Sequence, residues 1–146
     1  MGGVNRGIDV YRRTEAQSAS PVQLVVMLYD GALQSLTEAG AAQAAGDLRR
    51  RGLALRRVAA IIAECHATLD LEQGGAIASE LDRLYSYISG RLLDITVKRD
   101  GTAIDEIYRL LAPLRQAWAD AAAKDNLPAS APLPVTLAAA GDGMRR

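Results

Sequence analysis

Apolar residues recur every three or four positions along four long stretches of the chain, and this spacing constrains the fold more than any other feature of the sequence. In the first stretch, Val25, Leu28, Tyr29, Ala32 and Leu36 would all lie on one face of a helix. The period-two alternation that marks half-buried strands, bounded by hairpin turns, appears nowhere in the chain. The spacing therefore predicts an all-α protein.

Capping residues mark the first two helices. Residues 20–23 read Ser-Pro-Val-Gln, which combines a preferred N-cap, a proline suited to the first helical position and the glutamine of a capping box. A long helix should therefore begin there. Gly46 is a typical helix stop and Asp47 a typical N-cap, so we expect the first helix to end and the second to begin at this pair.

Two further breaks divide the rest of the pattern. The Gln-Gly-Gly sequence at 73–75 should separate the second helix from the third, and Asp-Gly at 100–101 should end the third. Thr102, followed three residues later by Asp105, is similar to a capping box and predicts the start of the fourth helix. Pro113 lies within that fourth apolar stripe, where it predicts a lost backbone hydrogen bond and a bend.

Short connections favour antiparallel neighbours, so we predict an antiparallel four-helix bundle. Residues 20–124 should form this domain. Residues 1–19 should form a flexible N-terminal segment with a short helical cap, in which Ile8 and Tyr11 share one face. Residues 125–146 are rich in Pro and Ala without periodicity, and we interpret them as a disordered tail.

Charge and hydropathy exclude several kinds of partner and location. The 17 Lys and Arg residues balance the 17 Asp and Glu residues, so nothing favours nucleic acid, and we interpret the arginines at 49–51 as a solvated helix face. The longest apolar run, 24–29, is far too short to insert in a membrane. A single cysteine and an N-terminus without a secretory signal are typical of the cytoplasm, where we expect the protein.

Catalytic and metal chemistry lack their usual residues. Metal and nucleophilic sites need several convergent ligands or a nucleophile with a base, whereas the only Cys and the only His are the adjacent Cys65 and His66. Adjacent helical positions project about 100° apart, so we interpret this pair as packing residues. A glycine-rich phosphate loop is also missing. We therefore expect no enzyme, no metal and no cofactor.

Some stretches are apolar all around the helix, which is more than one bundle stripe requires. Residues 24–29 form the clearest case, and apolar pairs recur at 92–93 and 110–111. One interpretation is a wide core with ordinary exposed leucines. The other is a groove that accepts an amphipathic helix of a partner, with Ile8 and Tyr11 as an intramolecular lid. The residue pattern leaves both interpretations open.

A long ordered set of residues between positions 7 and 120 matches the pattern of one known family. The matching positions are Gly7, Ile8, Tyr11, residues 18–21, Leu24, residues 27–32, Leu69, Asp70, Gly74, Gly75, Ile77, Ala78, Leu81, Leu84, Tyr85, Tyr87, residues 91–93, Ala117 and Trp118. Together they resemble FliS, the family of flagellar secretion chaperones of flagellin. The match covers most of the chain.

The resemblance implies a cytoplasmic export chaperone that binds the C-terminal segment of flagellin, prevents its premature polymerisation and helps deliver it to the flagellar type III secretion apparatus. It also implies that the N-terminal segment covers part of the binding surface and that the export gate is a candidate second partner. For flagellin binding we predict Ile8, Tyr11, Leu24, Met27, Leu28, Tyr29, Leu84, Tyr87 and Leu92, with core packing as the alternative for Leu28 and Tyr29. The alternative function is a homo-oligomeric structural or regulatory bundle, such as a homodimer without cargo.

Overall fold

The computed structural model describes residues 19–124, and all of the regular structure in that range is α-helical. The elements are α2 (Pro21–Ala44), α3 (Leu48–Ala67), α4 (Leu71–Val97) and α5 (Thr102–Lys124). This confirms the predicted all-α class. The predicted N-terminal cap with Ile8 and Tyr11 and the predicted tail at 125–146 lie outside the described residues.

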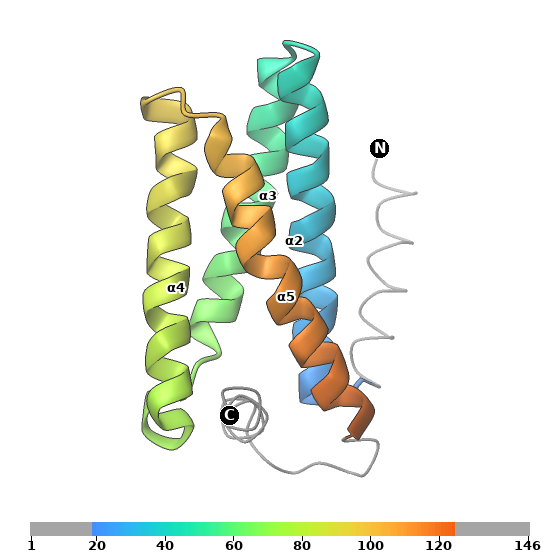
Figure 1. Ribbon diagram of the computed structural model, residues 1–146, viewed down its shortest axis with the longest axis vertical. Helices are drawn as coiled ribbons and strands as arrows, with labels where there is room; N and C mark the ends of the chain where they lie inside the picture. Colours follow the sequence, from blue (N-terminus) through green and yellow to red (C-terminus); the bar gives the residue numbers. More distant parts are fainter. Residues whose placement is uncertain (1–18, 125–146) are drawn as a thin grey trace, which may run out of the picture.

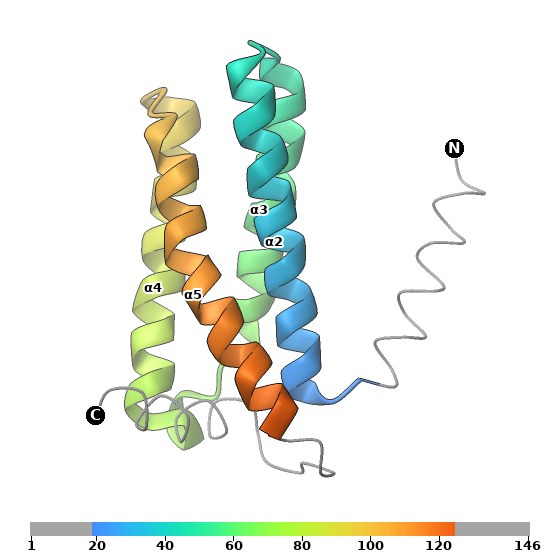
Figure 2. The same ribbon diagram turned by 45° about the vertical axis from the view of Figure 1, so that its right-hand side comes forward.

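The four helices run alternately up and down, so successive helices are antiparallel (Figures 1 and 2). Helix α2 packs extensively on both α3 and α5, whereas α4 packs more lightly on the same two helices. Helix α5 leans across the bundle, beginning beside the end of α4 and finishing beside the start of α2. The predicted antiparallel four-helix bundle is confirmed, with α4 as its most loosely attached member.

The caps of α2 and α3 form as the sequence predicts. The Ser20 hydroxyl accepts from the Gln23 backbone N–H at 3.1 Å, and the Gln23 side chain accepts from the Ser20 N–H at 2.8 Å. At the other end of α2, Gly46 takes a positive φ of 75°, which allows the Asp47 N–H to reach back to the Ala42 carbonyl at 2.8 Å. The Asp47 carboxylate then caps α3.

The start of α4 differs from the prediction. Asp70 caps the helix by accepting from the backbone N–H groups of Glu72 and Gln73, so α4 begins before the expected break. The break itself occurs inside the helix, where Gly75 has φ 57° and ψ −135°. Glycine tolerates this backbone conformation because it has no Cβ, and the chain resumes its helix afterwards.

The start of α5 also differs in its capping residue. The Asp100 carboxylate, rather than the Thr102 side chain, accepts from the first N–H of the helix, at 3.2 Å. Helix α5 does begin at Thr102, as predicted, and the aspartate two positions earlier provides the acceptor for the Thr102 N–H. Pro113 lies inside α5, and the helix continues on both sides of it, as the apolar stripe that runs past this proline predicts.

The core is built from one face of every helix, as the spacing predicted. Its largest fully buried side chains are Val22, Tyr29, Leu36, Val58, Ile62, Tyr85, Ile88, Ile95, Ile107 and Leu111. Tyr29 is only 1% exposed, and its burial raises the pKa of its phenol to about 12. Tyr29 is therefore a core residue, which is the alternative that the sequence left open for it.

Candidate functional site

Exposed apolar side chains border a groove between α3 and α4, which we call the α3/α4 groove. Its lining residues are Gly52, Leu55, Arg56 and Ala59 from α3, and Ser89, Leu92, Leu93 and Thr96 from α4. Leu93 is 65% exposed and Val97, one helical turn further along, is 75% exposed. Leu48, one turn before Gly52, is 61% exposed. Leu48, Leu93 and Val97 therefore form an exposed apolar strip along the groove.

The α3/α4 groove is deep because small residues form part of it. Leu55 and Leu92 are almost buried and form its floor, whereas Gly52 and Ala59 leave room above that floor. A Cβ atom added at Gly52 would meet no other atom within 4 Å. The resulting hollow has a volume of about 330 Å³. Side chains of a partner can therefore enter between the two helices.

Arg56 is the single charged residue among those that line the α3/α4 groove. Throughout residues 19–124, no hydrogen bond or ion pair to its guanidinium is found. The next cation on the same face is Arg49, seven residues or two helical turns earlier. The groove is thus mostly apolar and carries positive charge at its α3 rim.

A polar contact closes the lower part of the interface between α3 and α4. His66 Nε2 and Asp82 Oδ1 lie 2.5 Å apart, and the His66 ring lies 5.8 Å from that of Tyr85. The neighbouring Cys65 is buried, and burial raises the pKa of its thiol to about 12. This agrees with the packing role expected for Cys65, because a protonated buried thiol is a poor nucleophile.

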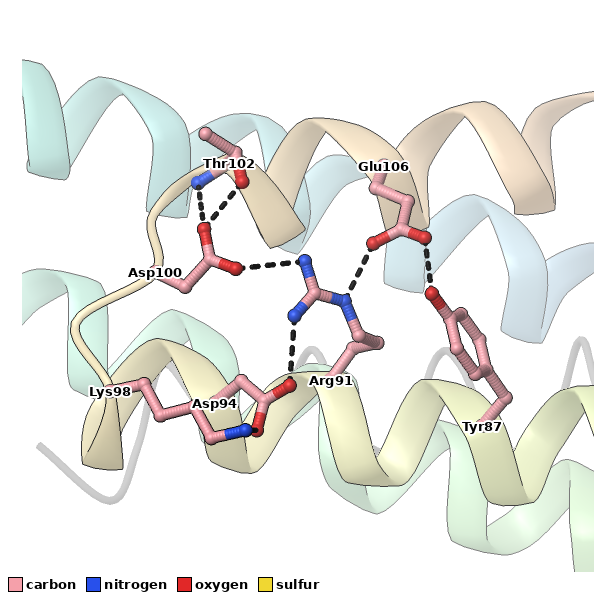
Figure 3. A network of polar contacts seen from close by, with 7 residues as sticks. All are labelled: Tyr87, Arg91, Asp94, Lys98, Asp100, Thr102 and Glu106. Atoms are coloured by element: carbon pink, nitrogen blue, oxygen red, sulfur yellow. Dashed lines mark hydrogen bonds and ion pairs between the residues drawn. The ribbon is translucent and has the colours of Figure 1, made fainter.

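On the other side of α4, a polar cluster attaches this helix to α5 (Figure 3). The Arg91 guanidinium donates to Asp94 at 2.8 Å, to Asp100 at 3.0 Å and to Glu106 at 2.6 Å. Tyr87 donates its hydroxyl to the second oxygen of Glu106 at 2.5 Å. We call these five residues the Arg91 cluster. It joins α4, the α4–α5 connection and α5 through one side chain.

The electrostatics of the Arg91 cluster follow from these contacts. Hydrogen bonds from Arg91 lower the pKa of Asp94, and those from Tyr87 and Arg91 lower the pKa of Glu106. Hydrogen bonds from Thr102 and Arg91 likewise lower the pKa of Asp100. The carboxylates in turn raise the pKa of Arg91. All four groups are charged at neutral pH, so the cluster holds the α4 wall of the groove in place.

A second hollow lies between α2 and α3, and we call it the α2/α3 groove. Its lining residues are Met27, Asp30, Gly31, Gln34, Ser35 and Glu38 from α2, and Arg57 and Ile61 from α3. Asp30 is paired with Arg115 of α5 at 2.7 Å, and Glu38 lies within 3.4 Å of both Arg50 and Arg57. This groove is polar, and its carboxylates already have arginine partners.

The structure distributes the predicted binding residues over several places. Met27 lines the α2/α3 groove, whereas Leu92 forms the floor of the α3/α4 groove. Leu24 is half-buried on α2, and Leu28 and Leu84 are half-buried against the core. Met27 and Leu92 therefore line different grooves.

Tyr87 is 48% exposed and belongs to the Arg91 cluster, so its hydroxyl is already engaged. Ile8 and Tyr11 lie outside the described residues. Gly52 and Leu93 line the α3/α4 groove but were not among the predicted binding residues, although the apolar pair at 92–93 indicated excess apolar surface.

Metal-ligand clusters and membrane-spanning helices are both missing from residues 19–124. No group of three or more His, Cys, Asp and Glu side chains in that range could hold a metal ion. Within the same range, every helix is too short or too polar to cross a bilayer. Both grooves are hollows in the described surface that a ligand could enter.

Comparison with known proteins gives a consistent result over most of the chain. Residues 4–125 match the family described as flagellar protein FliS. The chain is 39% identical over 117 residues to the flagellar secretion chaperone FliS of Salmonella typhimurium, covering 77% of this chain and 87% of the relative. It is 31% identical over 104 residues to FliSB of Pseudomonas aeruginosa, covering 71% and 82%. It is 30% identical over 115 residues to FliS of Vibrio cholerae, covering 76% and 85%.

Proposed function

The chain belongs to the FliS family of flagellar proteins, and from this we propose that it is a cytoplasmic export chaperone for flagellin. In this proposal it binds the C-terminal segment of flagellin, prevents premature polymerisation and helps deliver the subunit to the flagellar type III secretion apparatus. The names of its relatives support the role of secretion chaperone. It acts by binding, without catalysis and without a cofactor.

The observation that carries this proposal is the exposed apolar strip along the α3/α4 groove. Leu48, Leu93 and Val97 are all more than half exposed in the bundle alone, which is unusual for three large apolar side chains on one face. Covering such side chains contributes about 1.5–3 kcal/mol for each one that becomes fully buried. A partner segment that is disordered before binding loses part of this gain to ordering, which suits a cargo that must later be released.

We propose that contact extends beyond this strip to the predicted residues that remain accessible. Leu24 and Met27 are half-buried on α2, and Tyr87 is exposed on α4. Tyr29 takes no part because it is in the core. Ile8 and Tyr11 are proposed to compete with flagellin as an intramolecular lid, so that deleting residues 1–17 should increase the affinity for flagellin.

The proposal is tested by co-purification with flagellin from the same bacterium. We expect a defined complex with full-length flagellin and no complex with a flagellin that lacks its C-terminal segment. Binding should also increase helicity, measured by circular dichroism, because an apolar segment in a groove tends to order. Equal binding of the truncated flagellin, or no binding of either form, would contradict the proposal.

Self-association is the alternative way to cover the apolar strip. Light scattering over a concentration series separates the two cases, because the mass of a homo-oligomeric bundle rises with concentration. A chaperone should instead show a constant mass alone and a higher mass when flagellin is added. The export gate can be tested afterwards as a second partner, with the flagellin complex as the ligand.

A further inference from the structure

We propose that the α3/α4 groove holds an apolar stretch of the flagellin segment that carries a carboxylate, and that this carboxylate pairs with Arg56. This inference rests on the proposed function and adds where the segment lies and which chemistry the groove selects. Gly52 makes the groove deep because it has no side chain, and Arg56 is the charged residue of its lining.

The apolar part of the inference follows from the burial of the groove. Its floor is made by the nearly buried Leu55 and Leu92, and its rim by the exposed Leu93. The space next to Gly52 is open, because a Cβ atom added there would have no atom within 4 Å outside the nearby backbone of its own helix. A side chain of the ligand can occupy this room, contact the leucines on both helices and leave Leu93 less exposed.

The carboxylate follows from the charge of the groove. Arg56 is the one charged lining residue, and among residues 19–124 it has no acidic partner. Arg49 lies on the same face, so the α3 rim carries a second positive charge. Covering this rim with a purely apolar segment would remove water from a guanidinium without replacing its hydrogen bonds. An Asp or Glu of the ligand supplies them and can do so in a bidentate manner.

The α2/α3 groove lacks this combination. Its carboxylates, Asp30 and Glu38, are paired with Arg115 and with Arg50 and Arg57. A ligand there would have to displace existing ion pairs, whereas Arg56 offers a charge with no competing partner in the described bundle. The difference between the grooves therefore favours the α3/α4 groove for an acidic ligand.

The depth of the groove is tested with Gly52→Leu, which fills it from the α3 side. The change should preserve the helix, since Leu has a higher helix propensity than Gly and the space is open. Gly90→Leu is the matched control, because Gly90 is also helical with open space but does not line the groove. Leu93→Gln is a second variant, at an exposed position where a substitution should change stability little.

The readout is the Kd for a dye-labelled peptide with the sequence of the flagellin C-terminal segment, measured by fluorescence anisotropy with the full chain. Gly52→Leu and Leu93→Gln should each weaken binding about tenfold, with Gly90→Leu within about twofold of the parent chain. Circular dichroism checks that the helices are intact. Unchanged binding by a folded Gly52→Leu variant would overturn the assignment of the groove.

The charge is tested with Arg56→Gln against the control Arg83→Gln, an exposed arginine of α4 outside the groove. Each acidic residue of the peptide is also neutralised in turn. One of these neutralised peptides should bind the parent chain about tenfold more weakly than the original peptide does. Its Kd for the Arg56→Gln variant should be no weaker than its Kd for the parent chain, because the two changes remove the same ion pair. Losses that add for every peptide would overturn the pairing.

These outcomes are distinct from failure of the proposed function. If the parent chain does not bind the peptide or full-length flagellin at all, the function itself is wrong. If the parent chain binds but neither groove variant nor the charge pair affects the Kd, flagellin binding stands and the α3/α4 inference fails.

Discussion

The phenolic oxygens of Tyr29 and Tyr85 lie 2.6 Å apart inside the bundle. This hydrogen bond joins α2 to α4, two helices that otherwise pack mainly on α3 and α5. Both side chains are 1% exposed, so neither hydroxyl can turn to water for a partner. The two tyrosines therefore satisfy each other, and they connect the lightly packed α4 to the best packed helix of the bundle.

Changing Tyr29 to Phe should destabilise the bundle by about 1–3 kcal/mol, because it leaves the Tyr85 hydroxyl buried without a partner. Tyr85→Phe should have a similar effect. The double variant should lose less than the sum of the two, since it removes both polar groups. Urea unfolding measures all three, with the exposed Tyr108→Phe as a control expected to match the parent chain. Strict additivity would show that the hydroxyls do not interact.

The Arg91 cluster should make stability depend on pH on the acidic side. Its carboxylates have pKa values below their ordinary values of 3.8 and 4.5, so they stabilise the folded state above those values and lose this contribution as the pH falls through the lowered pKa values. Arg91→Met should therefore be destabilising near neutral pH. The difference from the parent chain should shrink as the pH falls through the lowered pKa values and the carboxylates become protonated.

Unfolding at several pH values tests this prediction, with Arg109→Met as the control. Arg109 pairs with Asp105 one helical turn away on the surface of α5, and both side chains are well exposed. Exposed pairs of this kind contribute little, so the control should show a small difference at every pH. A difference for Arg91→Met that stays constant with pH would mean that the side chain acts through packing.

Cys65 should resist thiol reagents as long as the protein is folded. Its thiol is buried, and its pKa of about 12 lies well above the ordinary value of 9.0, so almost no thiolate forms at neutral pH. The rate of reaction with a chromogenic disulfide should be slow and should rise sharply across the urea transition. In a Cys65→Ser chain, Ala63→Cys places a thiol at an exposed position and should react rapidly under the same conditions. Equal rates for the two folded chains would contradict burial of Cys65.

Loss of the Ser20 cap on α2 should lower the free energy of unfolding moderately, and the size of the loss should depend on the residue that replaces Ser20. Ser20→Ala removes the hydroxyl that accepts from the Gln23 N–H and should destabilise the bundle by about 1 kcal/mol. Ser20→Gly should cost only a few tenths of a kcal/mol, because glycine leaves the N–H groups open to water. Thermal unfolding of the two variants provides the comparison. Equal effects of Ala and Gly would show that the hydroxyl is not the stabilising group.

Much of the fold could be predicted from local pattern. The four apolar stripes predict the helices and their inward faces, and residues 20–23 and 46–47 predict caps that form with the expected hydrogen bonds. These features depend on neighbours within a few positions along the chain. The same local logic failed at Asp70 and Asp100, where a carboxylate earlier than the expected position captured the first N–H groups of the helix.

The candidate site depends on distances that a sequence pattern does not contain. The sequence indicated too much apolar surface and assigned most of it to residues 24–29, but Tyr29 proved to be core and the exposed strip proved to include Leu93 and Val97.

Helix periodicity tells which residues share a face, yet exposure depends on how closely the next helix approaches that face. Only the packing of α3 against α4 decided that Gly52 opens a groove and that Arg56 has no acidic neighbour among the described residues.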